Sequence, residues 1–203
     1  MAEIEQARIF GPPSEEPNLD IPDQGSWSEE EYLRAFPCRG YELSDGFVEV
    51  LPMPTEEHQD AVGYLYRTMY DYVKAHDLGK VQLPGLRVRL WERKIREPDV
   101  VFMLAEHADR RENRYWHGAD LAMEVVSDDK PSRDWKTKRA EYAQAGIREY
   151  WIVDPRDRSI TVLSLPEGET AYRETGRYTE GQTAASVLLD GFRVNLSEVF
   201  QPQ

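Results

Sequence analysis

The amino-acid sequence predicts an α/β fold, with helices covering both faces of a central mixed sheet. Three observations support this prediction. The chain has 203 residues, of which 40% are hydrophobic, so it can bury one sizeable core. Segments with helical periodicity also alternate with short apolar segments, typical of strands that are covered on both sides. Turn-forming residues separate these segments, and the expected architecture is therefore an αβα sandwich.

The chain is expected to begin with an irregular arm over residues 1–26, which are rich in proline, glycine and acidic residues. One domain is expected to follow over residues 27–203. Its first helix should begin at Ser28, because Glu31 follows at the spacing of a capping box, and should end before Pro37.

A hairpin and a long helix come next. The segment "YELSDGFVEVLP" is typical of a hairpin in which Asp45-Gly46 adopts the positive φ angles of a tight turn. The longest helix is expected to be capped by Thr55 and to end just before Gly79. Residues at three- and four-residue intervals give it one apolar face, made of Val62, Leu65, Met69, Tyr72 and Val73.

The second half of the chain is expected to contain most of the strands. The segment "KVQLPGLRVRLW" predicts a strand pair or one bent strand, and "PDVVFML" and "DLAMEVVS" predict central strands. A helix over "SRDWKTKRAEYAQAG" should stop at Gly146, before strands at "REYWIVDP" and "RSITVLSL". A β-rich stretch to Arg177 and a helical turn at "LSEVF" complete the expectation.

Composition disfavours several classes of protein. No segment approaches the roughly 18 apolar residues of a membrane span, and the N-terminus lacks a signal-peptide pattern. The single cysteine, Cys38, rules out an internal disulfide framework and suits the cytoplasm, where we expect the protein. The net charge of −13 argues against a nucleic-acid partner, but residues 1–31 hold nine acids against Arg8 alone. Residues 130–148, by contrast, are locally basic.

Two acidic residues occur in segments that should form buried strands. Asp99 precedes the apolar part of "PDVVFML", and Glu124 lies inside "DLAMEVVS". Buried carboxylates need compensation, and two that meet at one place would attract Mg²⁺ or Mn²⁺. Asp134, Lys138 and Tyr142 follow one another at i, i+4 and i+8 and so share one stripe of a helix. Lys138 should point from this stripe toward the strand that carries Glu124.

These features resemble the PD-(D/E)xK nuclease superfamily, whose sites combine such acids with a lysine. More narrowly, four segments resemble the bacterial Uma-type restriction endonuclease family, in the right order and over roughly residues 30–200: "YELSDGFVEVLPMPTEEHQDAVGYL", "REPDVVFML", "LAMEVVS" and "RDWKTKRAEYAQAGIREYWIVDP". The resemblance implies a restriction-endonuclease-like αβα sandwich and magnesium-dependent hydrolysis of phosphodiester bonds. It also implies nucleic acid as the substrate, with DNA expected, and the habits of this fold suggest a homodimer.

The resemblance carries over to single residues. Asp99 and Glu124 match the two acids that would hold the metal ion. Glu42 matches a further acid, either a third metal ligand or a hydrogen-bond partner of metal-bound water. The superfamily's usual lysine, two residues after the second acid, is replaced by Val126, and Lys138 in the following helix takes its place.

Each of these residues also has an ordinary structural interpretation. Asp99 is compatible with a turn acid at a strand start, and Glu124 with an edge strand or a buried arginine partner. Lys138 is compatible with a solvated helix lysine, and Glu42 with a cross-strand partner of a basic residue. His58, near the start of the long helix, is more typical of a surface or helix-start residue than of a general base.

Three functions follow from these alternatives. The first is a metal-dependent endonuclease in which bases of residues 130–148 contact phosphates. The second is a catalytically inactive nuclease-fold module for nucleic-acid binding or assembly, which Val126 and the acidic balance favour. The third is a carboxylate-pair hydrolase with another substrate.

Overall fold

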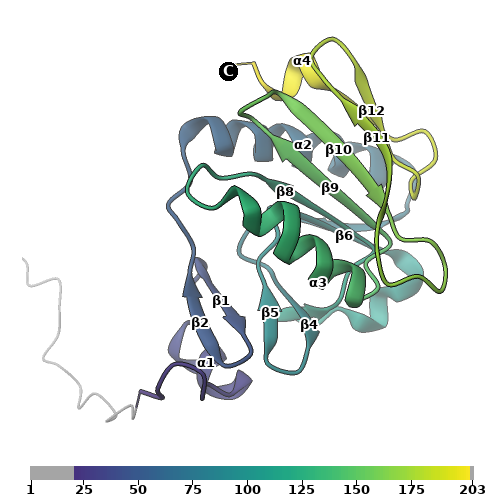
Figure 1. Ribbon diagram of the computed structural model, residues 1–203. Coiled ribbons are helices and arrows are strands. Elements are labelled where there is room, and N and C mark those ends of the chain that lie inside the picture. The colour runs from purple at the N-terminus through teal and green to yellow at the C-terminus, as the bar shows by residue number, and fades with distance from the viewer. Residues whose placement is uncertain (1–20, 202–203) are drawn as a thin grey trace, which may run out of the picture.

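A six-stranded sheet lies between two helices in the computed structural model, which describes residues 21–201 (Figure 1). Strands β8 and β9 are parallel and all other neighbours are antiparallel, so the sheet is mixed, as the sequence predicted. Most of the arm predicted over residues 1–26 lies outside the described residues. The strand order is β11 (Arg173–Tyr178), β10 (Ser159–Ser164), β9 (Glu149–Asp154), β8 (Leu121–Val125), β6 (Val100–Leu104) and β3 (Gly79–Gln82).

The two faces of this sheet carry separate apolar clusters, because successive side chains of a strand point in opposite directions. On one face, Phe102 of β6 belongs to the same buried cluster as Leu65 of helix α2 (Glu56–Ala75). On the other face, Val101 belongs to the same cluster as Tyr142 of helix α3 (Arg139–Gln144). Helices α2 and α3 accordingly lie on opposite sides of the sheet (Figure 1). The predicted αβα sandwich is confirmed.

Helix α2 begins as its sequence predicts and ends differently. The Thr55 hydroxyl accepts a hydrogen bond from the backbone N–H of His58 at 3.2 Å and caps the first turn. The expected end just before Gly79 is wrong, because the helix already ends at Ala75 and Asp77 adopts the left-handed conformation with φ 51°. Gly79 instead starts β3, where a Cβ atom would lie 2.1 Å from the carbonyl oxygen of Met103. A close approach of two strands, and not a helix end, requires this glycine.

A second sheet of five strands has the order β2-β1-β5-β4-β7. The predicted hairpin forms its edge, and Asp45 and Gly46 turn between β1 and β2 with φ angles of 53° and 84°. Helix α1 (Glu29–Ala35) has the predicted capping box of Ser28 and Glu31 and packs against this sheet through Tyr32. The five strands are β1 (Tyr41–Ser44), β2 (Phe47–Val50), β4 (Arg87–Trp91), β5 (Lys94–Arg96) and β7 (Tyr115–His117).

The expectation of a strand pair or a bent strand over "KVQLPGLRVRLW" is wrong. Strand β3 belongs to the six-stranded sheet and β4 to the five-stranded sheet. Between them Gly85 has φ 100°, which glycine adopts readily, and the chain passes from one sheet to the other. The pattern of apolar residues indicates that two strands form, but it does not identify the strands with which each of them pairs.

The predicted helix after β8 starts with an irregular turn. Residues Arg133–Lys138 form a π-helical segment, η2, that continues into α3, and Gly146 follows with φ 76°. Strands β8 and β9, on either side of this helix, are parallel neighbours. Five further elements were not expected from the sequence, since each is short: β5, β7, the 3₁₀ segment η1 (Ala105–Arg110), β12 (Thr183–Ala185) and β13 (Arg193–Asn195).

The expected helical turn at the C-terminus is present as α4 (Leu196–Val199). Its Leu196 and Val199 complete the apolar cluster that covers α2. Within residues 21–201, no helix is both long enough and apolar enough to cross a membrane.

Candidate active site

Strands β6 and β8 bring the two predicted acids to one edge of the six-stranded sheet. Val100 pairs with Met123, so Asp99 and Glu124 come from adjacent strands. The Asp99 Oδ2 atom accepts a hydrogen bond from the backbone N–H of Val125 at 2.8 Å. Both acids line one cleft of about 570 Å³ between the two sheets and the start of α2. The two acids thus come from neighbouring strands, as the sequence predicted.

The ammonium group of Lys138 enters this cleft from η2. Its Nζ atom lies 2.7 Å from Glu124 Oε2, 3.5 Å from Asp134 Oδ1 and 3.8 Å from Glu42 Oε1. Lys138 is only 5% exposed, which excludes its interpretation as a solvated helix lysine. Asp134 and Lys138 lie in the wider π-helical turn and Tyr142 lies in α3, and all three side chains are buried.

Glu124 has polar partners at both of its oxygens. Oε2 faces Lys138, and Oε1 accepts a 2.5 Å hydrogen bond from the hydroxyl of Tyr142. Glu124 is thus neither on an edge strand nor paired with an arginine, as its structural alternatives required. Each carboxylate oxygen has a second lone pair, so these contacts leave acceptor capacity.

Negative charge in the cleft exceeds what Lys138 compensates. Burial raises the pKa of the Glu124 carboxyl to about 8, with Asp99, Asp134 and Glu42 adding to the rise and only Lys138 opposing it strongly. Burial likewise raises the pKa of Asp134, again against the effect of Lys138. Hard oxygen donors with uncompensated negative charge fit a divalent cation such as Mg²⁺ or Mn²⁺.

The donor set resembles an incomplete coordination shell. Asp99 uses Oδ2 for the Val125 N–H, and no hydrogen bond of the described residues involves its Oδ1 atom. Across residues 21–201, no group of three or more His, Cys, Asp or Glu side chains is arranged to hold a metal ion alone. Water and substrate oxygens would have to complete the shell, and Mg²⁺ prefers this mixture to a full protein cage.

Glu42 lies in the same region but is fully compensated. Its Oε2 atom accepts from Arg96 at 2.9 Å and from Arg133, and its Oε1 atom accepts from the Glu97 N–H at 2.9 Å. Burial alone would raise the pKa of the Glu42 carboxyl, but Lys138, Arg96 and Arg133 lower it to about 2. These contacts match the cross-strand alternative, since Arg96 lies on the neighbouring strand β5. A role of Glu42 as a metal ligand stays a prediction.

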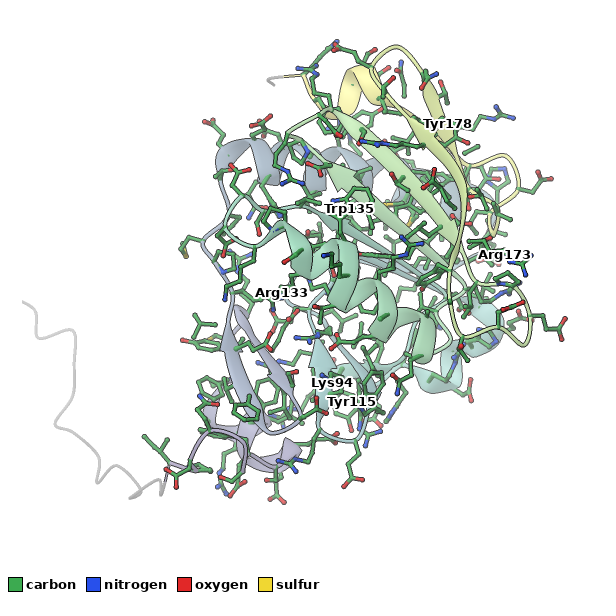
Figure 2. The ribbon with its side chains drawn as sticks, in the orientation of Figure 1. Lys94, Tyr115, Arg133, Trp135, Arg173 and Tyr178 are labelled. Carbon is green, nitrogen blue, oxygen red and sulfur yellow. The ribbon has the colours of Figure 1, made fainter. Side chains whose placement is uncertain are left out.

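A buried network of ion pairs surrounds Glu42 and was not expected from the sequence. Arg96 makes two hydrogen bonds of 2.8 Å to Glu141 of α3, and it also contacts Glu49 of β2 at 3.0 Å. Arg133, at the start of η2, lies next to the β1–β2 hairpin and reaches Glu49 as well (Figure 2). These partners are far apart in the chain, so no local pattern could have indicated them.

His58 also lines the cleft. Its Nε2 atom lies 3.3 Å from Asp99 Oδ2, and its Nδ1 atom is buried without a hydrogen-bond partner in the described part of the chain. Burial lowers the pKa of the imidazole, but Asp99 outweighs that effect and the pKa is raised. His58 is thus more than a surface residue at a helix start.

The bases of residues 130–148 are divided between the cleft and the surface. Arg133 and Lys138 turn inward to the acids, whereas Lys130, Lys136 and Arg148 are exposed. Arg139 is half-buried and donates to the carbonyl oxygen of Tyr172 at 3.5 Å. The predicted phosphate contacts of this segment therefore depend on the three exposed side chains, and they stay a prediction.

Acid should weaken the domain through Glu42. Its pKa is lower in the folded chain than the ordinary 4.5, so its ionised form stabilises the fold above pH 4.5 and is lost as the pH falls toward 2. Ionisation of Glu42 should contribute up to about 3 kcal/mol over this window. Glu42→Gln should be less stable than wild type at pH 7, and the difference should shrink between pH 4.5 and 2. Urea denaturation at each pH measures it; a constant difference would contradict the prediction, and exposed Glu169→Gln is the control.

Comparisons with known proteins identify the family of the chain and a structure with the same fold. The Uma2 family, described as "Putative restriction endonuclease", matches residues 29–197. A crystal structure of "a putative nuclease belonging to DUF820" from Anabaena variabilis ATCC 29413 is similar, with a TM-score of 0.67 and 18% sequence identity. The similarity covers 86% of this chain and 97% of that chain, and at this identity it shows a shared fold. No curated protein matches.

Proposed function

The chain belongs to the Uma2 family, and we propose that it is a metal-dependent endonuclease that hydrolyses phosphodiester bonds of nucleic acid, with DNA as the expected substrate. One observation carries the proposal. Asp99 and Glu124 line one cleft with Lys138, whose ammonium group lies 2.7 Å from Glu124. Acids that can hold a metal ion, together with a lysine that can stabilise charge on a phosphate, support phosphodiester hydrolysis.

Asp99 and Glu124 would hold Mg²⁺ or Mn²⁺, with Asp134 close enough to add an oxygen or to hold a water molecule. When bound, the ion polarises the phosphate and stabilises the leaving oxygen. Lys138 would orient the attacking water and offset the charge that grows on the phosphate. Tyr142 would keep Glu124 in place through its hydrogen bond to Oε1.

Glu42 would hold the side chains of Arg96, Arg133 and Lys138 in place. It lies between Arg96 and Arg133 and 3.8 Å from Lys138, and two of these three cations, Arg133 and Lys138, line the cleft. Its low pKa keeps it ionised for this task at neutral pH.

The replacement of the usual lysine has a structural explanation. Val126 is 3% exposed and belongs to the apolar cluster that contains Tyr142. Val126 also lines the cleft, but the ammonium group beside Glu124 is supplied from the helix by Lys138. Loss of the usual lysine therefore does not by itself support an inactive protein.

An inactive nucleic-acid-binding or assembly module is the second candidate. The acids at the mouth of the cleft favour it, because Asp128 and Asp129 are exposed there and would repel a phosphate backbone. The two candidates differ in one measurable property, hydrolysis.

The test is cleavage of supercoiled plasmid and of single- and double-stranded DNA and RNA oligonucleotides. Wild type should nick DNA with Mg²⁺ or Mn²⁺ and not with EDTA, and Asp99→Asn should lose about 10²-fold or more of this activity because a ligand charge is removed. Asp71→Asn, an exposed acid on α2, is the matched control and should behave as wild type.

Each other outcome has a meaning. Absence of cleavage on every substrate would favour the inactive module. Equal cleavage by wild type and Asp99→Asn would point to a contaminating nuclease, and metal-independent hydrolysis would favour a different hydrolase. We also expect a homodimer, which light scattering coupled to size-exclusion chromatography measures.

A further inference from the structure

His58 and Asp99 contact each other at the beginning of α2. His58 Nε2 lies 3.3 Å from Asp99 Oδ2, the oxygen that also accepts the Val125 N–H at 2.8 Å. Two groups on different elements, α2 and β8, therefore hold the same oxygen. The other carboxylate oxygen, Oδ1, has no hydrogen bond among the described residues. An acid fixed through one oxygen presents the other in a constant direction.

The backbone around His58 is fixed as well. Its N–H donates to the Thr55 cap at 3.2 Å, so the residue belongs to the first ordered turn of a 20-residue helix. Its side chain is 16% exposed and that of Asp99 is 14% exposed. The contact is thus largely withdrawn from water, which would otherwise weaken it.

The second ring nitrogen of His58, Nδ1, lies in a position that is unfavourable for the stability of the fold. Nδ1 of His58 is buried and has no partner in the described part of the chain. A buried polar atom without a hydrogen bond lowers the stability of the fold. The polar contacts of the ring are with the Asp99 carboxylate and, with a smaller effect on its pKa, with the backbone of Val125.

We propose that His58 is a positioning residue that fixes the Asp99 carboxylate through Oδ2, so that Oδ1 faces the divalent cation. This inference rests on the proposed function, because it gives His58 a task at the same metal site. Residues that orient a metal ligand typically contribute about 10- to 100-fold in metal affinity. The expected effect is therefore large enough to measure on the protein without any substrate.

The experiment compares two substitutions in the full chain. His58→Phe keeps a ring of similar size but has no nitrogen, and His58→Gln keeps an N–H that can reach the carboxylate. Titration calorimetry with Mn²⁺ alone should give a dissociation constant about 10- to 100-fold higher for His58→Phe and within about threefold of wild type for His58→Gln. His76→Phe, at the exposed end of the same helix, should leave Mn²⁺ affinity unchanged.

Three further readouts separate positioning from other roles. The metal-free His58→Phe protein should keep the circular dichroism spectrum of wild type, which shows that a loss of Mn²⁺ affinity does not come from unfolding. The Mn²⁺ complex of wild type should show no nitrogen coupling in electron spin-echo spectra, since His58 contacts the ligand and not the ion. With nucleic acid, at a fixed Mn²⁺ concentration below saturation, kcat should fall and KM should change little.

The outcomes also separate this inference from the proposed function. If His58→Phe binds Mn²⁺ as tightly as wild type while Asp99→Asn does not, the positioning role is overturned and the metal site stands. A nitrogen coupling that disappears in His58→Phe would overturn it too, in favour of direct coordination. If wild type itself binds no Mn²⁺, both the inference and the proposed metal-dependent function fail.

Discussion

Lys138→Met is expected to lower kcat for DNA cleavage about 10²- to 10³-fold, as removal of one preorganised electrostatic group does in other active sites. Methionine keeps much of the length of the side chain but has no charge to orient water or to offset charge on the phosphate. Divalent metal affinity should stay the same or increase, because Lys138 is the cation that now competes for Glu124 and Asp134. This separation of turnover from metal binding distinguishes Lys138 from Asp99.

The measurement combines single-turnover cleavage with Mn²⁺ titration of the same protein samples. Lys136→Met is the matched control, since Lys136 lies on the same segment and is exposed, and it should retain wild-type turnover. A fall in both metal affinity and turnover for Lys138→Met would contradict the assignment, and so would unchanged turnover. Circular dichroism should verify that the variant is folded.

Arg96→Met is expected to destabilise the domain by about 3–5 kcal/mol, the range for loss of one partner from a buried ion pair. Arg96 is 1% exposed. Its Nη1 atom donates to Glu42 and Glu49, and its Nε and Nη2 atoms donate to Glu141. Without it, Glu42 and Glu141 would remain buried with less positive charge. Because these acids lie on β1 and α3, the loss should loosen the contact between the five-stranded sheet and α3.

Urea denaturation at pH 7 measures this effect. Arg173→Met is the control, because Arg173 lies at the outer strand β11 and pairs with Glu169 in solvent, where the expected change is below about 1 kcal/mol. Its exposed position can be followed in Figure 2. Arg96→Lys should recover only part of the loss, since lysine cannot make the bidentate contact to Glu141. A loss below about 1 kcal/mol for Arg96→Met would show that the network contributes little.

The sequence predicts those site residues that differ in type from their neighbours in the chain. Asp99 and Glu124 were noticeable because acids are rare in apolar strand segments, and Lys138 because it shares a helical stripe with buried residues. Arg96, Arg133 and Glu141 gave no such signal. Charged residues are common next to strands and on helices, and only folding reveals which of them meet.

The sequence by itself determined the elements of this protein: the capped helix at Thr55, the Asp45-Gly46 turn, the apolar central strands and the stripe of Asp134, Lys138 and Tyr142. These depend on residues within one or two turns of the chain, so local preference and periodicity are sufficient. Only the tertiary structure decided that β3 and β4 join different sheets, that Glu42 faces two arginines, and that His58 meets Asp99. Such contacts follow from the burial of many apolar side chains at once, and the free energy of that packing is a property of the whole chain.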